Sequence, residues 1–394
     1  MRILIAGTTY HPALNGQAIF TVNLAEGLAA RGHDVLVAFP SDKAISRQRH
    51  NVQLDGIKSL SLGAVHGDTF VPFFPSRAVK KIFDQFKPEI VHIQDHYPVC
   101  RATIFEARRR HLKIVGTNHF MPENLAPYIP GLSKIKPVYN WILWHWMLEV
   151  YNRVDVATAQ SRVAAELIRK QGLRIPVLPA SCGIDLRRFH PDSATDRVAC
   201  RLRYGIDPDK IIFLFVGRVD KEKRVDVLLH AMKELKRDDI QLVIAGKGAA
   251  SGDFEGLAKS LNLGERVRFT GFIPNEDLHV LLNSVDVFTM PSEAELLSIA
   301  SLEAMACARP VLLADAVALP DLVTPGQNGY LFKPGNAKDA ACYMETLADQ
   351  RSQWEQMGKV SLEKAQYHSL ENTISRYEKL YQRVLADEPL TTDL

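Results

Sequence analysis

Two cationic side chains follow a strand-like segment in the second half of the chain. The apolar run from Ile211 to Val216 is followed by Gly217 and then by Arg218 and Lys223. In open α/β sheets, ligands bind at the carboxyl ends of the strands. We therefore expect a glycine turn that presents both cations there, where they can neutralise a pyrophosphate without a metal. A solvated helix start is the alternative interpretation of this pattern.

Two carboxylates lie in a similar region further along. A buried strand from Val285 to Met290 is followed by a loop and a helix. Glu295 precedes the helix, which we expect to begin near Leu297, and Glu303 lies within it. The first N–H groups of a helix have no partner inside it and attract anions. A phosphate can therefore bind between the two carboxylates. A carboxylate on each side of a phosphate suits hydroxyl-rich groups, a sugar on one side and a ribose on the other.

The first strand-to-helix turn does not have the pattern of a dinucleotide site. It runs from Gly7 to Gly16 and leads into a helix whose N–H groups can hold an anion. Its glycines lack the G-x-G-x-x-G spacing. An NAD-dependent enzyme or a non-catalytic nucleotide-binding protein is therefore a remote alternative, and a plain surface loop is another interpretation of this segment.

Strands and helices alternate along the chain and must position these residues. Short apolar runs at 3–6 and 34–39 flank a helical pattern at 16–31, and the same alternation restarts at 211–216 after a polar stretch. This order predicts βαβ units on parallel sheets. We therefore expect an α/β protein with two doubly wound, Rossmann-like domains.

The domain boundaries are predicted from composition. Prolines and glycines between residues 180 and 208 indicate a linker. We expect an N-terminal domain at 1–190 and a C-terminal domain at 191–368. The tail at about 369–394 has apolar residues at helical spacing, and this amphipathic helix is expected to fold back onto the first domain.

Composition is that of an ordinary globular protein. The chain has 394 residues, 46% of them hydrophobic, and five cysteines without a C-x-x-C pair, which favours a reducing cytoplasm. No signal peptide or membrane-spanning stretch is expected.

Residues 1–190 carry 24 Lys and Arg against 14 Asp and Glu, whereas the rest carry 24 against 31. The basic half suits either an anionic membrane surface or only solvent.

Two motifs near the carboxylates reveal a family resemblance. The pattern P-S-x-x-E at 291–295 and L-E-A-M-A at 302–306 resembles the signature of retaining glycosyltransferases of family 4, which have the GT-B fold. The resemblance covers nearly the whole chain. Further matching segments, in order, are 22–35, G-I-D at 183–185, I-A-G-K-G at 244–248 and N-G-Y-L at 328–331.

The resemblance implies two domains that face each other across a cleft and a role for several residues. It makes Arg218 and Lys223 the pyrophosphate clamp, Glu295 the partner of the sugar hydroxyls and Glu303 the partner of the ribose. It also implies that Gly16 lets the backbone approach the donor phosphate and that His119 lies beside the transferred sugar. The implied reaction is the retaining transfer of a hexose from a UDP- or GDP-linked sugar.

The chain departs from the commonest family pattern after the first carboxylate. Leu296, Leu297 and Ser298 stand where the family often has Gly-Phe-Gly, so phosphate binding through backbone N–H groups should persist while the space near the sugar changes. Asp321 replaces a common glutamate and is left without a role. No D-x-D motif ends a strand, so we expect neither a metal nor another cofactor.

The acceptor is expected to be set by the first domain. Trp141 and Trp144 lie in one helical segment close to Lys134 and Lys136, a combination that suits a helix on anionic lipid. This region is similar to that of diacylglycerol glycosyltransferases, which implies a membrane glycolipid precursor as acceptor and a peripheral position on the inner face of the membrane. A packed core helix is the alternative, together with a soluble or glycan acceptor. No nucleic-acid partner is expected.

Overall fold

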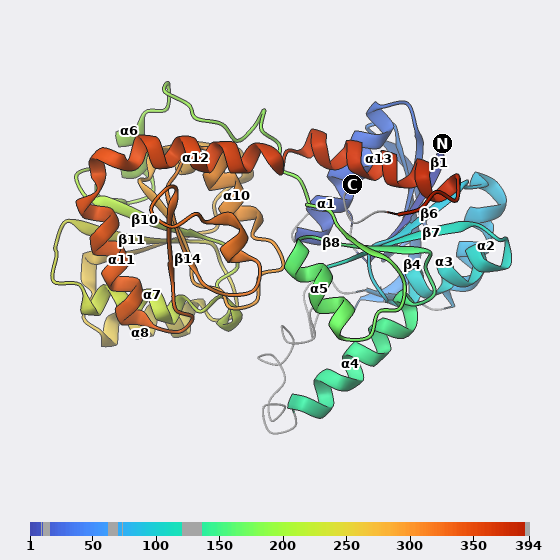
Figure 1. The fold of residues 1–394 in the computed structure, drawn as a ribbon, viewed down its shortest axis with the longest axis horizontal. Coiled ribbons are helices and arrows are strands. Elements are labelled where there is room, and N and C mark those ends of the chain that lie inside the picture. Colours follow the sequence, from blue (N-terminus) through green and yellow to red (C-terminus); the bar gives the residue numbers. More distant parts are fainter. Residues whose placement is uncertain (9, 11–15, 62–69, 73, 120–135, 391–394) are drawn as a thin grey trace. The chain divides into compact units, whose positions relative to one another are not determined.

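Two compact units make up the chain. The computed structural model describes residues 1–8, 10, 16–61, 70–72, 74–119 and 136–390. One unit comprises Met1–Gly183 and Leu370–Leu394, and the other comprises Ile184–Ser369 (Figure 1). Each contains a largely parallel sheet with helices packed against it, so the expectation of two Rossmann-like α/β domains is confirmed.

The described part of the first unit contains a nine-stranded sheet in the order β3-β4-β2-β1-β6-β7-β8-β9, with β5 paired to β4. Strands β3 and β5 are antiparallel to β4, whereas the other pairs are parallel. The strands are β1 Arg2–Ala6, β2 Asp34–Ser41, β3 Ile45–Arg49, β4 Val52–Ser61, β5 Phe70–Pro72, β6 Ile90–Ile93, β7 Lys113–Asn118, β8 Val156–Ala159 and β9 Val177–Pro179.

The C-terminal helix packs in the first unit, against the helix that follows β1. A Cβ atom at Gly27 of α1 would lie 2.1 Å from Cδ1 of Ile374 in α13, so the two helices touch at a position without a side chain. Arg31 reinforces the contact through an ion pair of 2.7 Å with Glu378. The helices of this unit are α1 Gly16–Ala30, α2 Pro75–Phe86, α3 Pro98–Arg109, α4 Lys136–Tyr151, α5 Arg162–Lys170 and α13 Leu370–Leu385.

The second unit contains a parallel six-stranded sheet in the order β12-β11-β10-β13-β14-β15. Figure 1 shows α12 on one side of this sheet and α7 and α8 on the other. The strands are β10 Ile211–Val216, β11 Ile240–Ala245, β12 Val267–Gly271, β13 Val287–Met290, β14 Val311–Ala314 and β15 Gly329–Phe332. The helices are α6 Arg197–Arg203, α7 Val225–Glu234, α8 Ser251–Ser260, α9 Asn275–Ser284, α10 Ile299–Ala306, α11 Ala337–Asp349 and α12 Trp354–Tyr367.

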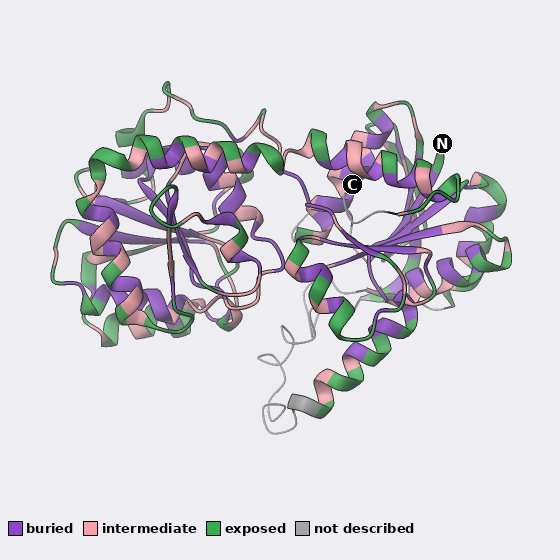
Figure 2. Cartoon of the chain, viewed as in Figure 1, coloured by how far each residue is buried: buried purple, intermediate pink, exposed green. Residues whose placement is uncertain are grey.

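Burial explains why the central strands could be recognised and β3 could not. Helices cover both faces of a parallel sheet, so β1 and β10 are almost entirely apolar and buried (Figure 2). By contrast, β3 has the sequence ISRQR and is mostly exposed at the sheet edge. A charged edge strand discourages pairing with other chains but has no hydrophobic period that would identify it.

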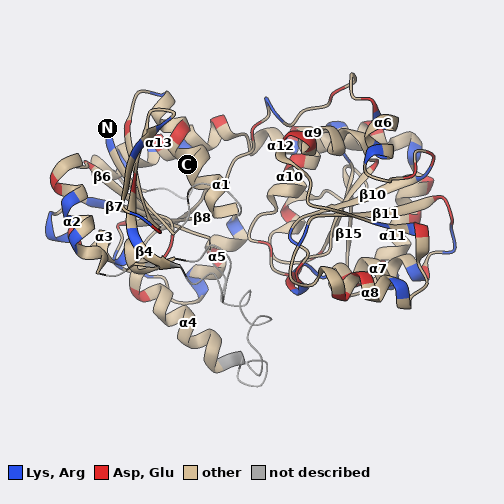
Figure 3. Ribbon diagram, turned by 180° about the vertical axis from the view of Figure 1, so that it is seen from behind, with Lys and Arg blue, Asp and Glu red and all other residues tan. Residues whose placement is uncertain are grey.

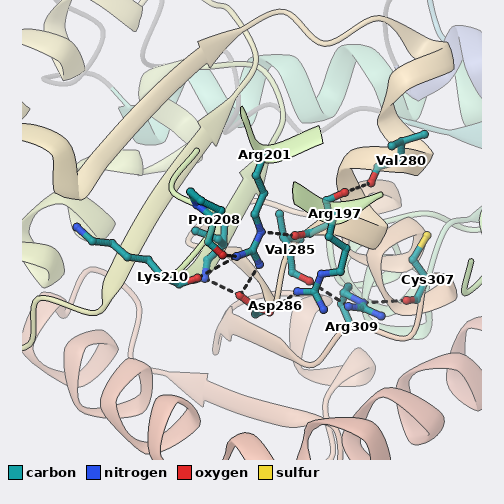
Figure 4. Close-up of polar contacts among 11 residues, drawn as sticks. Arg197, Arg201, Pro208, Lys210, Val280, Val285, Asp286, Cys307 and Arg309 are labelled. Carbon is teal, nitrogen blue, oxygen red and sulfur yellow. Dashed lines mark hydrogen bonds and ion pairs between the residues drawn. The ribbon is translucent and has the colours of Figure 1, made fainter. Parts of the chain in front are cut away.

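The segment predicted to be a linker is instead part of the second unit. The units divide at Gly183 and Ile184, not after His190. Within the supposed linker, Arg197 and Arg201 of α6 form ion pairs of 2.5 and 2.9 Å with the carboxylate of Asp286 (Figure 4). This carboxylate also accepts the N–H of Ile212 in β10. Polar residues therefore belong to the packed unit here because their charges are paired.

The carboxyl ends of β10 and β11 approach each other so closely that a glycine is required. Gly246 has a φ of +141°, and a Cβ atom there would lie 1.9 Å from the carbonyl oxygen of Gly217. Its N–H donates to the carbonyl of Gly271 at the end of β12. The loops that follow three neighbouring strands are thereby held together at one edge of the sheet.

Candidate active site

The predicted cations and the first predicted carboxylate lie together at this edge of the second unit. A short 3₁₀ turn, Lys221–Lys223, follows β10 and places the Nζ atom of Lys223 2.6 Å from Oε1 of Glu295. Arg218 is joined to the same cluster through Glu222, to which it pairs at 2.9 Å, while Lys223 lies 3.9 Å from that carboxylate. Residues from two separate loops thus form one ion-pair network.

Two acids of this network were not identified from the sequence. Glu222 lies between the cations, and Asp220 pairs with Nε of Arg218 at 3.2 Å and accepts the N–H of Ala249. The sequence pattern could have identified these two acids, because acidic residues adjacent to a basic turn are the expected partners for its charges. Both cations therefore already have carboxylate partners in this structure.

Lys223 remains strongly cationic despite its burial. Its side chain is 20% exposed, and desolvation acts to lower the pKa of its ammonium group. The carboxylates of Glu295 and Glu222 outweigh that effect and raise the pKa above its ordinary value. An ammonium has three N–H donors, so Lys223 can keep its bond to Glu295 and still donate to a second anion.

Helix α10 begins slightly later than the sequence suggests. Ser298 is its N-cap and accepts the N–H of Ser301 at 3.3 Å, so the helix starts at Ile299 rather than near Leu297. The N–H groups of Ile299 and Ala300 lie in the first turn and have no acceptor within the helix. Leu296 and Leu297 are 7% and 6% exposed and pack inward. The start of α10 therefore offers backbone donors directly after Glu295.

Glu303 lies within α10 in a setting that disfavours its charge. Burial raises the pKa of its carboxyl to about 7, and the positive charge of Arg188 opposes this shift only in part. A carboxylate in such a place, with no ion-pair partner at contact distance among the residues that the structure describes, is costly for folding. Such a cost is typical of residues that serve a ligand.

The predicted histidine of the first unit follows β7 and is hydrogen-bonded at both ring nitrogens. Its Nε2 atom lies 2.9 Å from Oε1 of Gln94, and its Nδ1 atom lies 2.8 Å from Nε2 of Gln160. Burial lowers the pKa of His119 to about 3. Both glutamines escaped the sequence analysis, although each directly follows a buried strand, where ligand-binding residues of α/β sheets are found.

The predicted glycine of the first turn begins α1. Gly16 is exposed, and the loop residues 11–15 before it lie outside the described residues. The next residue, Gln17, donates to Asp95, which follows β6 and also accepts the N–H of Thr8 at 2.7 Å. Asp95 was not singled out from the sequence. It ties the start of α1 to the carboxyl end of the central strands.

The two tryptophans predicted in the aromatic helix α4 differ in burial. Trp144 is 5% exposed and packs in the core, whereas Trp141 is 62% exposed and stacks on His145. Lys136 begins the helix, but Lys134 and the side chain of Lys136 lie outside the described residues. One face of α4 is therefore core, and its N-terminal half exposes large apolar side chains.

Positive charge is prominent elsewhere on the first unit. In Figure 3, lysine and arginine positions are blue along α2 and α3, whose sequences include Arg77, Lys80, Lys81, Arg108 and Arg109. In the part of the chain that the structure describes, no helix is long and apolar enough to span a bilayer.

Comparisons with known proteins identify both units. Residues 14–188 match the family model described as Glycosyltransferase Family 4, and residues 199–363 match the model described as Glycosyl transferases group 1.

The enzymes to which the chain is similar in sequence include the following three. It is 28% identical to the sulfoquinovosyl transferase SQD2 of Arabidopsis thaliana, over 72% of this chain but only 54% of that protein. It is 27% identical to a GDP-mannose-dependent alpha-mannosyltransferase of Corynebacterium glutamicum, over 88% of this chain and 79% of the relative. It is 25% identical to the alpha-monoglucosyldiacylglycerol synthase of Streptococcus pneumoniae, over 84% and 75%.

Solved structures resemble the fold as a whole. Sucrose-phosphate synthase from Thermosynechococcus elongatus has a TM-score of 0.82 at 20% identity, covering 98% of this chain and all of that one. HepE of Anabaena in complex with UDP-glucose has a TM-score of 0.77 at 16% identity, covering 96% of this chain and 99% of that one.

Proposed function

We propose a function from the family of this chain, which belongs to the GT-B glycosyltransferases with a family 4 domain followed by a group 1 domain. In this proposal the chain transfers a hexose with retention from a UDP- or GDP-linked sugar. The acceptor is a hydroxyl of a membrane glycolipid precursor such as diacylglycerol. The observation that carries the donor half of this proposal is the 2.6 Å ion pair between Lys223 and Glu295 beside the capped start of α10. It puts a cation in contact with a carboxylate that lies three positions before the N-cap Ser298, and the first N–H groups of a helix have no acceptor within it.

The donor would be held by residues of the second unit. Arg218, Lys223 and the first N–H groups of α10 meet the diphosphate, Glu295 accepts hydrogen bonds from the sugar, and Glu303 accepts them from the ribose hydroxyls. These donors are fixed before the reaction, so they stabilise the charge that develops on the leaving diphosphate at little reorganisation cost. We propose that they do so without a metal ion or another cofactor.

The chemical step would take place on one face of the sugar. The bond between the anomeric carbon and the phosphate oxygen breaks, and the acceptor oxygen bonds to the anomeric carbon from the same side. The acceptor proton passes to an oxygen of the departing β-phosphate. In this proposal His119 lies beside the sugar as an uncharged ring, because burial keeps its pKa at about 3.

The proposal of a lipid acceptor rests on α4 and on the relatives. Val138, Trp141 and Ile142 are 59%, 62% and 52% exposed, and exposed large apolar side chains on a helix favour contact with a bilayer. An alpha-monoglucosyldiacylglycerol synthase is among the relatives. We therefore place the enzyme at the cytoplasmic face of a membrane. A soluble or glycan acceptor is the competing proposal.

We expect nucleotide diphosphate release from a panel of UDP- and GDP-sugars to require liposomes that contain diacylglycerol and anionic lipid. Glu295→Ala should abolish the release. Trp141→Ser should lower the liposome-dependent rate severalfold, whereas Leu202→Ser, at an equally exposed site (62%) of α6 in the second unit, should not affect the dependence on liposomes. Equal release without liposomes would point to a soluble acceptor, and no release from any donor would contradict the glycosyltransferase activity itself.

Glu303→Gln is expected to affect stability and donor binding in opposite directions. A folded-state pKa of about 7, above the ordinary 4.5, means that the stability gained by holding the proton is complete below pH 4.5 and is lost as the pH rises through 7. Glutamine cannot ionise, so the variant should be more stable than the wild type at pH 8, by about 2–3 kcal/mol at most. The two should be equally stable near pH 4.5.

Donor binding should show the reverse dependence. The wild-type KM for the donor should fall as the pH rises through about 7, because the ionised carboxylate accepts two ribose hydroxyls. The variant should have a high KM at every pH. Thermal unfolding and donor KM, both measured between pH 5 and 8, test the two halves, and a variant that is less stable at pH 8 would contradict the burial argument.

A further inference from the structure

Three parallel strands of the first unit bring together the side chains that surround the proposed sugar-site histidine. Strands β6, β7 and β8 are neighbours in the sheet. The first residue after each strand is Gln94, His119 and Gln160, respectively. The carboxyl ends of parallel strands meet at one edge, so the histidine lies between the two glutamines and bonds to both.

The chemistry of these two contacts selects one form of the imidazole. The amide oxygen of Gln94 can only accept, so the Nε2 atom of His119, at 2.9 Å, must carry the proton and donate it. The amide nitrogen of Gln160 can only donate, so the Nδ1 atom, at 2.8 Å, must be bare. An imidazolium would place an N–H against the amide N–H of Gln160 and lose that bond.

A second layer of hydrogen bonds holds Gln94 in place from beneath. Gln94 and His92 are both 0% exposed, and the amide nitrogen of Gln94 lies 3.3 Å from the ring of His92. That ring is itself fixed, because its Nδ1 atom lies 2.6 Å from the hydroxyl of Tyr381 in α13 and its Nε2 atom lies 2.7 Å from the hydroxyl of Thr117. Side chains from two strands and the C-terminal helix thus limit how the amide can turn.

The same helix supports His119 from a second direction. Tyr377 bonds to the hydroxyls of Thr117 and Thr158 at 3.1 and 3.0 Å. Phe20 of α1 lies between this tyrosine and the histidine, with ring centroids 5.5 and 5.0 Å away. The position of the ring is therefore set by packing as well as by hydrogen bonds.

The electrostatic setting agrees with a neutral ring. Burial lowers the pKa of His119 to about 3. The neighbouring histidine His92 interacts with it electrostatically. Burial is the main reason why the pKa of His92 is lowered to about 3, and the charge of His119 is the smaller one. Within the described part of the chain, the hydrogen-bond partners of the two histidines are amides and hydroxyls, and none is a carboxylate that would hold a proton on the ring.

We propose that Gln94 and Gln160 are positioning residues that hold His119 as a neutral imidazole with its proton on Nε2. The proposal rests on the proposed function, since it explains why that form is useful there. Glycosyl transfer proceeds through a sugar that gains positive charge at the anomeric carbon. A neutral ring beside that carbon avoids the repulsion that an imidazolium would cause, and a fixed tautomer avoids reorganisation during the reaction.

The test is the ¹⁵N NMR spectrum of the full-length protein labelled in histidine, in which the His119 signals are identified by their absence in His119→Asn. The wild type should show the Nε2–H tautomer and no titration down to about pH 5. In Gln160→Glu a carboxylate replaces the amide donor and can only accept from Nδ1. The pKa of the ring should therefore rise by at least about one unit, with a proton on both nitrogens at low pH.

Two further variants separate positioning from folding and from surface charge. Gln160→Met removes the donor without adding charge and should yield a mixture of tautomers. Gln85→Glu makes the same charge change at an exposed site of α2 and should leave the His119 spectrum unchanged. In an active enzyme, Gln160→Glu should lower kcat about tenfold or more, with a smaller change in donor KM.

A wild-type His119 that carries its proton on Nδ1 or titrates near the free-imidazole pKa would overturn the proposal, as would an unchanged spectrum in Gln160→Glu. The spectrum needs no substrate. If only the proposed function is wrong, the tautomer is as expected but no donor is turned over. If only the positioning role is wrong, the enzyme is active but the tautomer differs.

Discussion

Replacing Lys223 with methionine is expected to lower kcat/KM for nucleotide-sugar turnover by about 10²–10³-fold, the usual effect of removing one preorganised donor from a developing anion. The ammonium is largely buried, and desolvation acts to lower its pKa. The attraction of Glu295 and Glu222 is stronger, so the pKa is raised overall. It is therefore a full positive charge held where the diphosphate is proposed to leave. Methionine keeps the length of the side chain but supplies neither charge nor N–H donors.

Lys221→Met is the matched control, because Lys221 belongs to the same 3₁₀ turn but is 68% exposed and pairs with an exposed Asp253. It makes the same change in net charge and should retain nearly full activity. Initial rates of nucleotide diphosphate release, at several donor concentrations, measure both variants. Equal rates for the two would show that Lys223 does not contact the reacting phosphates.

Loss of activity in Lys223→Met must also be distinguished from loss of folding. Removing the ammonium leaves the carboxylate of Glu295, which is 12% exposed, without its cation. The double variant Lys223→Met/Glu295→Gln removes that unpaired charge and should recover the melting temperature. It should not recover activity, since both proposed donor contacts are gone.

Asp286→Ala is expected to reduce the stability of the second unit by about 3–5 kcal/mol, because it leaves the buried guanidinium of Arg201 without a counter-charge. The Arg201 side chain is 6% exposed, and the ion pair measures 2.9 Å. Its remaining N–H groups donate to the backbone carbonyls of Ser284, Pro208 and Lys210 (Figure 4). The arginine is held in this place and cannot turn toward solvent without breaking those bonds.

Hydrogen exchange followed by mass spectrometry can localise this effect to one unit. Peptides from β10 and β13 should exchange about 10²–10³-fold faster in Asp286→Ala, while peptides from β1 in the other unit should not change. Asp253→Ala removes an exposed carboxylate from the same unit and should change exchange very little. Uniformly faster exchange in both units would mean that they unfold together, and unchanged exchange in β10 would show that the cluster contributes no stability.

The candidate site residues of the second unit could be singled out from the sequence more completely than those of the first. Glu295, Glu303 and the two cations stand in motifs with fixed spacing, so their types and order could be recognised without coordinates. Gln94 and Gln160 stand in no motif and are 66 residues apart in the chain. Only the pairing of β6, β7 and β8 brings them to the same histidine.

Several boundaries also depended on tertiary contacts. The sequence favoured a start of α10 near Leu297, but that side chain and Leu296 pack inward, and Ser298 becomes the cap. The polar residues before β10 indicated a linker, yet Arg201 is buried among acceptors that lie up to 85 positions further along the chain. Polar composition alone cannot show whether a charge is solvated or paired.

The fold class, the order of the main strands and helices and the family could all be predicted without coordinates. Hydrophobic period and the spacing of short motifs are local properties, and both can be read along the chain. The carboxylate that neutralises Lys223, the amides that hold His119 and the unit that contains residues 184–208 became known only from the folded chain. Those outcomes depend on pairings between distant segments, because the energy of a charge or a hydrogen bond is set by the groups that surround it in space.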